Sequence, residues 1–251
     1  MRSSSRLILV TLIALTLRGS YITQVVGSGS PLIGTGVVAG SLDGNSVTTP
    51  QYNTVGAGVI VVATSTLGTT LGTVTSSPAN TWTCLTQYPD TAHASQICYS
   101  LSPTTSTTQT FTFTATGERP AVVVFAFSGV TAFDAGKDIG SSTAGASSIQ
   151  PGSLTPSATN GILVVQMASN GIIAPVAVDS GFSTPALFFD ATATSAQIAA
   201  SFLVETAAVA KNPTLSWSGV VPASAAMAIF KGSASVGAGA FLGASRSSVG
   251  Q

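Results

Sequence analysis

The residues able to perform acid–base chemistry are few in this chain. His93 is the only histidine, and Asp90 is the nearest carboxylate to it in the sequence. A serine nucleophile needs a histidine held by a carboxylate, so His93 is the only candidate base. It follows Pro89 closely, at the tip of a predicted hairpin, where we expect a solvated turn side chain instead. No Gly-x-Ser-x-Gly motif is present, and we predict no catalytic residues.

Paired carboxylates are the second chemistry to consider, because glycoside hydrolysis uses two acids that flank one bond. Glu205 ends an apolar run and is the most interesting candidate acid. A charge at the end of a strand that extends into solvent explains its position equally simply, and we favour that explanation. Asp43-Gly44-Asn45 and Asp134 to Asp138 are short acidic loops without the EF-hand pattern, and they are typical of turns. We expect no metal and no cofactor. The eight carboxylates are Asp43, Asp90, Glu118, Asp134, Asp138, Asp179, Asp190 and Glu205.

Aromatic side chains could bind sugars by stacking on their faces. Tyr88 and Tyr99 are the candidate ligand-binding residues, with Tyr88 at the hairpin tip the better exposed of the two. Trp82 and Trp217 fall on inward phases of predicted strands, so we expect both in the core.

Charge is scarce: only 6% of the 251 residues are charged, and the formal net charge is zero. No charged residue lies between Asp43 and Asp90, or from Ile139 to Val178. Binding to nucleic acid depends on basic residues that neutralise phosphates, so we expect no nucleic-acid partner. For the same reason we expect no anionic membrane surface as a partner once the signal segment is removed.

The N-terminus predicts export. Arg2 and Arg6 precede the apolar run from Leu7 to Leu17, which has the length of a signal-peptide core and is short for a membrane span. Val26-Gly27-Ser28 is a tolerable cleavage site, although Arg18 directly after the run is unusual. The alternative is a buried first helix or strand. We divide the chain into residues 1–28, a β-sandwich domain at 29–233, and a flexible Gly/Ser/Ala tail at 234–251.

The two cysteines, Cys84 and Cys98, each lie in a strand-like run. Pro89-Asp90 between them is a turn signal, and a hairpin centred near residue 91 places the two cysteines opposite each other. Such a pair can form a disulfide in an oxidising compartment. Two buried thiols are the alternative.

Short β-branched runs separated by Gly, Pro, Asn and Ser predict an all-β protein. Thr110 to Thr114 alternates hydroxyl with Phe, as a half-buried strand does, and Val122–Phe127 is apolar on both faces, as in a central strand. Residues 136–159 are rich in Ser, Gly and Pro and predict a linker. The expected strands are Val59–Ser65, Thr81–Gln87, Gln96–Leu101, Gln109–Thr116, Ala121–Phe127, Ile162–Ala168, Ile198–Glu205, Thr214–Trp217 and Ala225–Phe230.

Two pairs of segments suggest an internal repeat. Gly58–Val62 resembles Gly161–Val165, at an offset of 161 − 58 = 103, and the run from Ala121 resembles the run from Ser224 at the same offset. The possible halves are residues 55–132 and 158–233, and we expect them to pack closely together.

Three motifs carry a resemblance. Asn80-Thr81-Trp82-Thr83, then Ile97-Cys98-Tyr99, then Val124 to Val130 resemble a loosely defined group of exported, jelly-roll-like β-sandwich domains of bacterial secreted proteins and phage particles. The resemblance covers roughly residues 35 to 232. It departs at Pro78-Ala79, where an Asp/Gly-rich turn is usual. It implies an extracellular or particle-surface β-sandwich and transfers no catalytic residue.

These observations favour a non-enzymatic secreted or surface protein with a structural, adhesive or carbohydrate-binding role. The first alternative is a virion component such as a capsid, fibre or decoration protein. A glycoside hydrolase with paired carboxylates is the least favoured. Because Ser and Thr replace charges on the strands, edge strands are poorly defended. We therefore expect neutral glycans, or a second copy of the chain, as partners.

Overall fold

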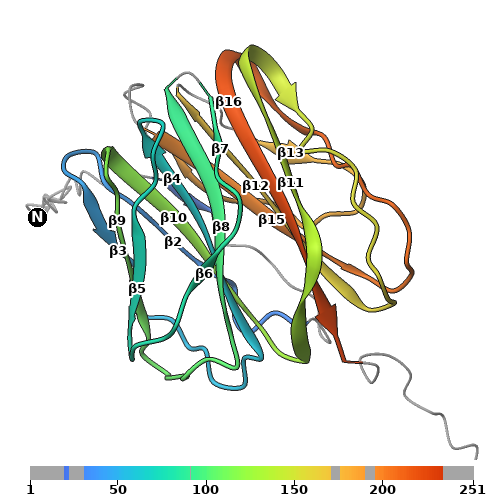
Figure 1. The fold of residues 1–251 in the computed structure, drawn as a ribbon. Coiled ribbons are helices and arrows are strands. Elements are labelled where there is room, and N and C mark those ends of the chain that lie inside the picture. The colour runs from blue at the N-terminus through green and yellow to red at the C-terminus, as the bar shows by residue number, and fades with distance from the viewer. Residues whose placement is uncertain (1–19, 23–30, 91, 171–175, 190–195, 234–251) are drawn as a thin grey trace, which may run out of the picture.

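A computed structural model describes residues 20–22, 31–90, 92–170, 176–189 and 196–233 (Figure 1). These residues form antiparallel strands and no helix, so the all-β prediction is confirmed. The sheets stack face to face, as in a β-sandwich. Among the residues described, no helix is long and apolar enough to cross a membrane.

The first layers come from the N-terminal part of the chain. A three-stranded sheet, which we call sheet C, has the order β3-β9-β5, and sheet B has the order β2-β10-β4-β8-β6, with β7 also paired to β8. Sheet C lies on the outer side of sheet B (Figure 1). The bounds are β2 Val37–Gly40, β3 Ser46–Thr48, β4 Val59–Leu67, β5 Thr73–Ser77, β6 Thr83–Cys84, β7 Tyr88–Pro89, β8 His93–Leu101, β9 Thr110–Thr114 and β10 Glu118–Phe127.

Sheet A lies on the other side of sheet B and comes mainly from the C-terminal part of the chain. Its order is β1-β14-β15-β12-β16-β11, with β13 also paired to β16. The bounds are β1 Ser20–Ile22, β11 Val130–Ile149, β12 Gly161–Asn170, β13 Ala177–Val178, β14 Ala186–Phe189, β15 Ala196–Glu205 and β16 Leu215–Gly232.

Three apolar layers hold the stack together. The central layer joins sheets A and B and includes Phe125 and Phe230. A second layer, with Phe111 and Phe113, joins sheets B and C. The third lies on the far face of sheet A and includes Trp217. Residues Val122–Phe127 of β10 are all buried, because β10 is covered on both faces, as the sequence predicts.

The predicted linker at residues 136–159 is wrong over its first part. Residues up to Ile149 belong to β11, which pairs along its length with β16. Small residues such as Gly140 and Ser141 give no alternation of apolar and polar side chains, so the sequence carries no strand signal here. The strand is defined by the hydrogen bonds of its backbone to β16. The ladder also shifts register four times, which breaks any regular pattern.

Strand β16 is one continuous element where the sequence predicts two. The predicted strands Thr214–Trp217 and Ala225–Phe230 are joined through Gly219 and Pro222. Gly219 has a φ of 89°, which only glycine adopts at little cost, and it allows the long strand to bend.

Three pairing registers coincide between the two parts of the chain. Adding 103 to the pair Val59↔Leu101 of β4·β8 gives Ile162↔Val204, a pair of β12·β15. The same step turns ladder β4·β10 into β12·β16, and β5·β9 into β13·β16. The register between two paired strands can in principle take many values. Three ladders that agree at one offset of 103 therefore show that these strands are arranged alike in the two parts.

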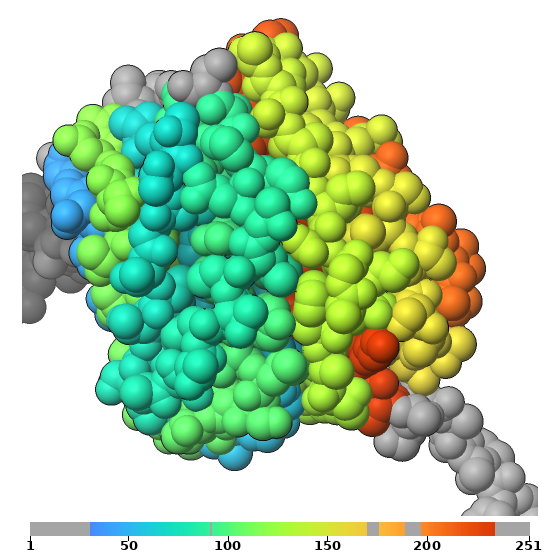
Figure 2. All heavy atoms as spheres, in the orientation of Figure 1, coloured from blue at the N-terminus to red at the C-terminus, as the bar shows by residue number. Residues whose placement is uncertain are grey.

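The likeness extends to the outer layers. The start of β16 pairs with β13 and with the end of β11, just as β9 pairs with β5 and β3. Contacts between the parts are reciprocal: β8 lies against β12 and β16, and β15 lies against β4 and β10. Figure 2 shows the two parts meeting side by side, the earlier residues in blue to green and the later ones in yellow to red.

The predicted signal segment and the predicted tail fall almost wholly outside the described residues. Of residues 1–28 only Ser20–Ile22 are described, as β1, which pairs with β14 at the edge of sheet A. The predicted cleavage site at Val26-Gly27-Ser28 and residues 234–251 lie outside the described ranges.

Candidate binding surfaces

His93 is not the solvated turn residue that the sequence predicts. It begins β8 and is completely buried. Its Nδ1 lies 3.3 Å from Oδ1 of Asp90. Burial opposes ionisation of Asp90, but hydrogen bonds with His93 and the backbone N–H of Ala92 outweigh it and lower the pKa of Asp90. In the described part of the chain no hydrogen-bond partner reaches Nε2 of His93. The pair therefore closes a turn inside the fold, with no surface for a substrate.

Other carboxylates are anchored one by one in separate places. Asp134 accepts hydrogen bonds from the backbone N–H and the hydroxyl of Ser157, each at 2.7 Å. Oδ1 of Asp179 accepts the backbone N–H of Thr214 at 2.8 Å. Glu205 forms an ion pair of 2.7 Å with Lys211.

These partners fix loops to strands, which is a structural role. Within the described ranges no group of three His, Cys, Asp or Glu side chains comes together. Asp190, one of the eight candidate acids, lies outside them.

The two candidate tyrosines lie at the contact between sheets A and B. Tyr99 is 9% exposed, and its ring contacts those of Phe133 and Phe230 at centroid distances of 5.2 and 5.4 Å. Tyr88 is half-buried, and its ring lies against the backbone of Gly140 on β11. Both rings therefore contribute packing area between the sheets, and Tyr99 offers no face for stacking.

The disulfide prediction is confirmed. Cys84 and Cys98 are directly opposed in the ladder between β6 and β8, with Cα atoms 4.0 Å apart, and they are bonded. The backbone N–H of Leu85 donates to the carbonyl of Ile97 in the neighbouring pair. The bond thus joins a non-hydrogen-bonded pair, in which the side chains come closest.

Sheet C presents a face made entirely of hydroxyl residues, which we call the hydroxyl face. Most of its inward residues are apolar, such as Phe111 and Phe113 on β9. Every outward residue of the three strands is Ser or Thr, and none carries a charge. They are Ser46 and Thr48 on β3, Thr73, Thr75 and Ser77 on β5, and Thr110, Thr112 and Thr114 on β9.

The pairing registers align these hydroxyls in rows across the sheet. One row is Ser46, Thr114 and Thr73; the next is Thr48, Thr112 and Thr75. Neighbouring strands are about 4.8 Å apart, and the hydroxyls of Thr48 and Thr112 are hydrogen-bonded at 2.8 Å. The face is a regular, neutral grid of donors, acceptors and methyl groups.

A shallow groove lies at the end of β8, and we call it the Asn80 groove. It has a volume of about 320 Å³ and is lined by the segment Ala79–Thr81 on one side and by the end of β8 on the other. Its lining is uncharged and mostly hydroxyl-bearing: Ala79, Asn80, Thr81, Ser100, Leu101, Ser102 and Thr104.

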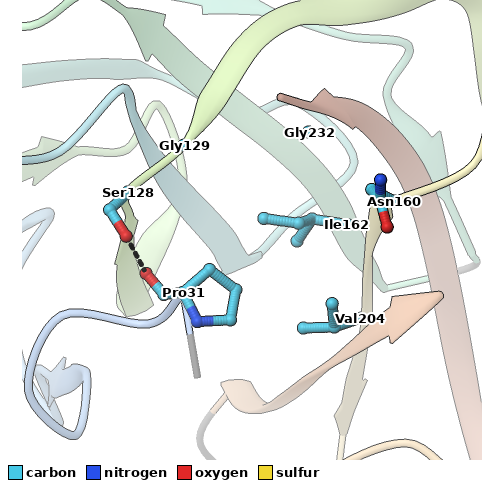
Figure 3. Close-up of a pocket in the computed structure, with 7 residues that line it drawn as sticks. All are labelled: Pro31, Ser128, Gly129, Asn160, Ile162, Val204 and Gly232. Carbon is cyan, nitrogen blue, oxygen red and sulfur yellow. Dashed lines mark hydrogen bonds between the residues drawn. The ribbon is translucent and has the colours of Figure 1, made fainter. Parts of the chain in front are cut away.

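A second cavity, shown in Figure 3, lies between the Ser128-Gly129 turn and the end of β16. Its volume of about 10 Å³ has room for roughly one water molecule. The hydroxyl of Ser128 donates to the carbonyl of Pro31 there, at 3.1 Å. This cavity is a packing gap and is too small for a ligand.

Comparison with known proteins supplies no relative. No protein family model matches the chain, and neither a curated protein nor a solved structure is significantly similar to it.

The sequence contains a signal for one of these surfaces but not for the other. The alternation of Thr and Phe in residues 110–114 predicts a hydroxyl-bearing outer face on one strand. The Asn80 groove is formed by two segments about twenty residues apart, and the distance between them depends on how the chain enters β6. No local pattern encodes that distance.

Proposed function

We propose that this protein is a non-enzymatic structural or adhesive component of an extracellular or particle surface, and that its hydroxyl face binds a second copy of the chain. The observation that carries the proposal is the composition of that face: eight outward side chains, all Ser or Thr. A typical sheet surface carries Lys, Glu or Arg, whose charges keep copies apart.

Hydroxyl groups make this face complementary to itself, because each one can donate and accept a hydrogen bond. Two such faces meet without buried charge and without charge repulsion. The two edge strands of sheet C, β3 and β5, also favour a second copy of the chain as the partner. In the described ranges no strand pairs with the outer edge of β3 or of β5, and neither strand contains a charged residue or a proline.

The anchored carboxylates and the buried His93 support a structural role over catalysis. Their partners are the protein's own backbone and hydroxyl groups, as with Asp134 and Ser157. Self-association of this kind serves a surface layer or an adhesin. It also serves a virion component, which is the alternative that the resemblance implies.

The dependence of self-association on salt tests the proposal. Contacts between neutral hydroxyl faces are not screened by salt, whereas contacts between charged patches are. We expect sedimentation velocity to detect multimers in similar proportion at 0.05 and 1 M NaCl, between which the Debye length falls roughly four- to fivefold. A monomer at every concentration, or multimers that dissociate in 1 M NaCl, would contradict the proposal.

A further inference from the structure

The Asn80 groove exposes a backbone position that the neighbouring strand leaves open. The N–H of Ser102 donates to Gly58 on the β4 side, whereas the carbonyl of Ile97 accepts from Leu85 on the β6 side. In an antiparallel ladder these directions alternate with each residue. The N–H and C=O of Leu101 therefore point to the β6 side.

Strand β6 does not reach Leu101. Its last pair in this direction is Thr83 with Tyr99, and in the described chain around the groove no backbone hydrogen bond joins Thr81 to Leu101. One donor and one acceptor of the backbone thus face the groove. The side chain of Leu101 is also 37% exposed there, which is unusual for a leucine in this protein.

The ladders β6·β8 and β14·β15 do not coincide at the offset of 103, because Thr83 pairs with Tyr99 whereas Ala186 pairs with Ala200. In the second part, Ser183 precedes β14 and bonds to β15. The N–H of Ser183 donates to the carbonyl of Phe202 at 2.9 Å, and its hydroxyl lies 3.0 Å from that of Ser201. That segment is thereby fastened to β15.

In the first part, the side chain of Asn80 bonds to β5 and to the loop that follows β8. Its Nδ2 donates to the hydroxyl of Ser76 and to the carbonyl of Thr104, and its Oδ1 accepts the N–H of Thr104 at 2.7 Å. These three bonds fasten the segment to β5 and to the loop that follows β8. The groove is thus framed by segments that are held in place by hydrogen bonds.

We propose that the Asn80 groove binds a neutral saccharide. The hydroxyls of Thr81, Ser100 and Ser102, together with the backbone of Leu101, can pair with sugar hydroxyls. No cation lines the groove to hold a phosphate or carboxylate, and a single open backbone position is too short for a peptide strand to pair with. The groove is separate from the hydroxyl face and does not depend on self-association.

The experiment is a screen of the full chain on an array of neutral glycans. The best binder is then titrated in solution while the amide signals of Leu101 and Thr104 are followed by NMR. We expect millimolar to micromolar binding that shifts those two amides. Thr81→Phe, which places a ring in the groove, is expected to weaken binding at least tenfold.

Thr75→Phe is the matched control, because it makes the same change on the hydroxyl face, outside the groove. It is expected to bind the glycan as the natural chain does while altering self-association. Well-dispersed spectra of both variants show that they fold. Absence of any binder on the neutral array, or equal binding by Thr81→Phe and the natural chain, would overturn the saccharide site and leave self-association to its own test.

Discussion

The ring of Phe188 on β14 lies directly against the backbone of Gly40 on β2. A Cβ atom at residue 40 would come within 2.1 to 2.4 Å of three ring carbons. The corresponding contact in the other direction joins Tyr88 to Gly140, where a Cβ would lie 2.4 Å from the ring. Each of the two stacked sheets thus places an aromatic ring on a glycine of the other, which sets how closely sheets A and B approach.

We expect Gly40→Ala to destabilise the fold by about 1–3 kcal/mol, because the ring of Phe188 must shift to admit the methyl group. Chemical denaturation measures this change in the free energy of unfolding. Gly145→Ala on β11 is the control, since its Cβ would lie 3.5 Å from Val220, an ordinary contact. In a Phe188→Leu background the cost of Gly40→Ala should fall. An equal cost in both backgrounds would show that the ring does not set the spacing.

Loss of the disulfide should also destabilise the protein measurably. Cys84 and Cys98 are 14 residues apart, and a cross-link that closes a loop of about 15 residues contributes about 3 kcal/mol in the chain-entropy model. We expect the Cys84→Ser/Cys98→Ser variant to unfold at lower denaturant concentration and to be insensitive to reductant. Reduction should lower the stability of the natural chain to about that of the variant. Unchanged stability of the reduced natural chain would contradict this role.

Acid should unfold the protein through its anchored carboxylates. Burial opposes ionisation of Asp134, but the bonds from Ser157 and the nearby Lys231 outweigh it and lower the pKa of Asp134 in the folded state. A lowered folded pKa means stabilisation that is complete above the unfolded pKa of about 3.9 and is lost as the pH falls through the folded pKa.

The free energy of unfolding measured from pH 7 to pH 2.5 checks this. Asp134→Asn removes the charge, so we expect it to cost about 1–3 kcal/mol at pH 7 and to flatten the decline below pH 4. Parallel curves for the variant and the natural chain would exclude Asp134 as a source of the acid sensitivity.

Substitution of Gln166 should raise the free energy of unfolding, whereas the substitutions above should lower it. Gln166 is completely buried on β12, and in the described structure neither atom of its amide has a hydrogen-bond partner. A buried amide without partners costs about 1–3 kcal/mol, so Gln166→Met should stabilise the protein by up to that amount. Thermal and chemical unfolding measure it. A destabilised Gln166→Met variant would show that the amide is satisfied in solution.

Local patterns in the sequence predicted the long apolar strands and the disulfide, but not the short apolar strands β2 and β14. The Cys84–Cys98 pair followed from a turn signal and symmetric spacing, and β10 followed from its continuous apolar run. Strands β5 and β11 were missed, because Ser, Thr and Gly dominate them and their pairing comes from partners far along the chain.

The sites depended still more on long-range structure. The burial of His93 was not predicted, because the residue belongs to β8, where it pairs with Leu67 of β4, and not to a free hairpin tip. Tyr88 contacts Gly140 of the facing sheet, and no local pattern encodes that contact. Alternation showed which side of β9 bears hydroxyls, but only the register shows that β3 and β5 complete the face.

Self-association through the hydroxyl face is tested most directly by sedimentation velocity of the Thr48→Lys/Thr75→Lys variant beside the natural chain. Both threonines are exposed on that face. The control, Ser148→Lys/Ser216→Lys, adds the same charge at exposed, paired positions of the corresponding outer layer. We predict that the first variant is monomeric where the natural chain and the control form multimers. Multimers of equal size in all three proteins, or a monomeric natural chain, would contradict the account.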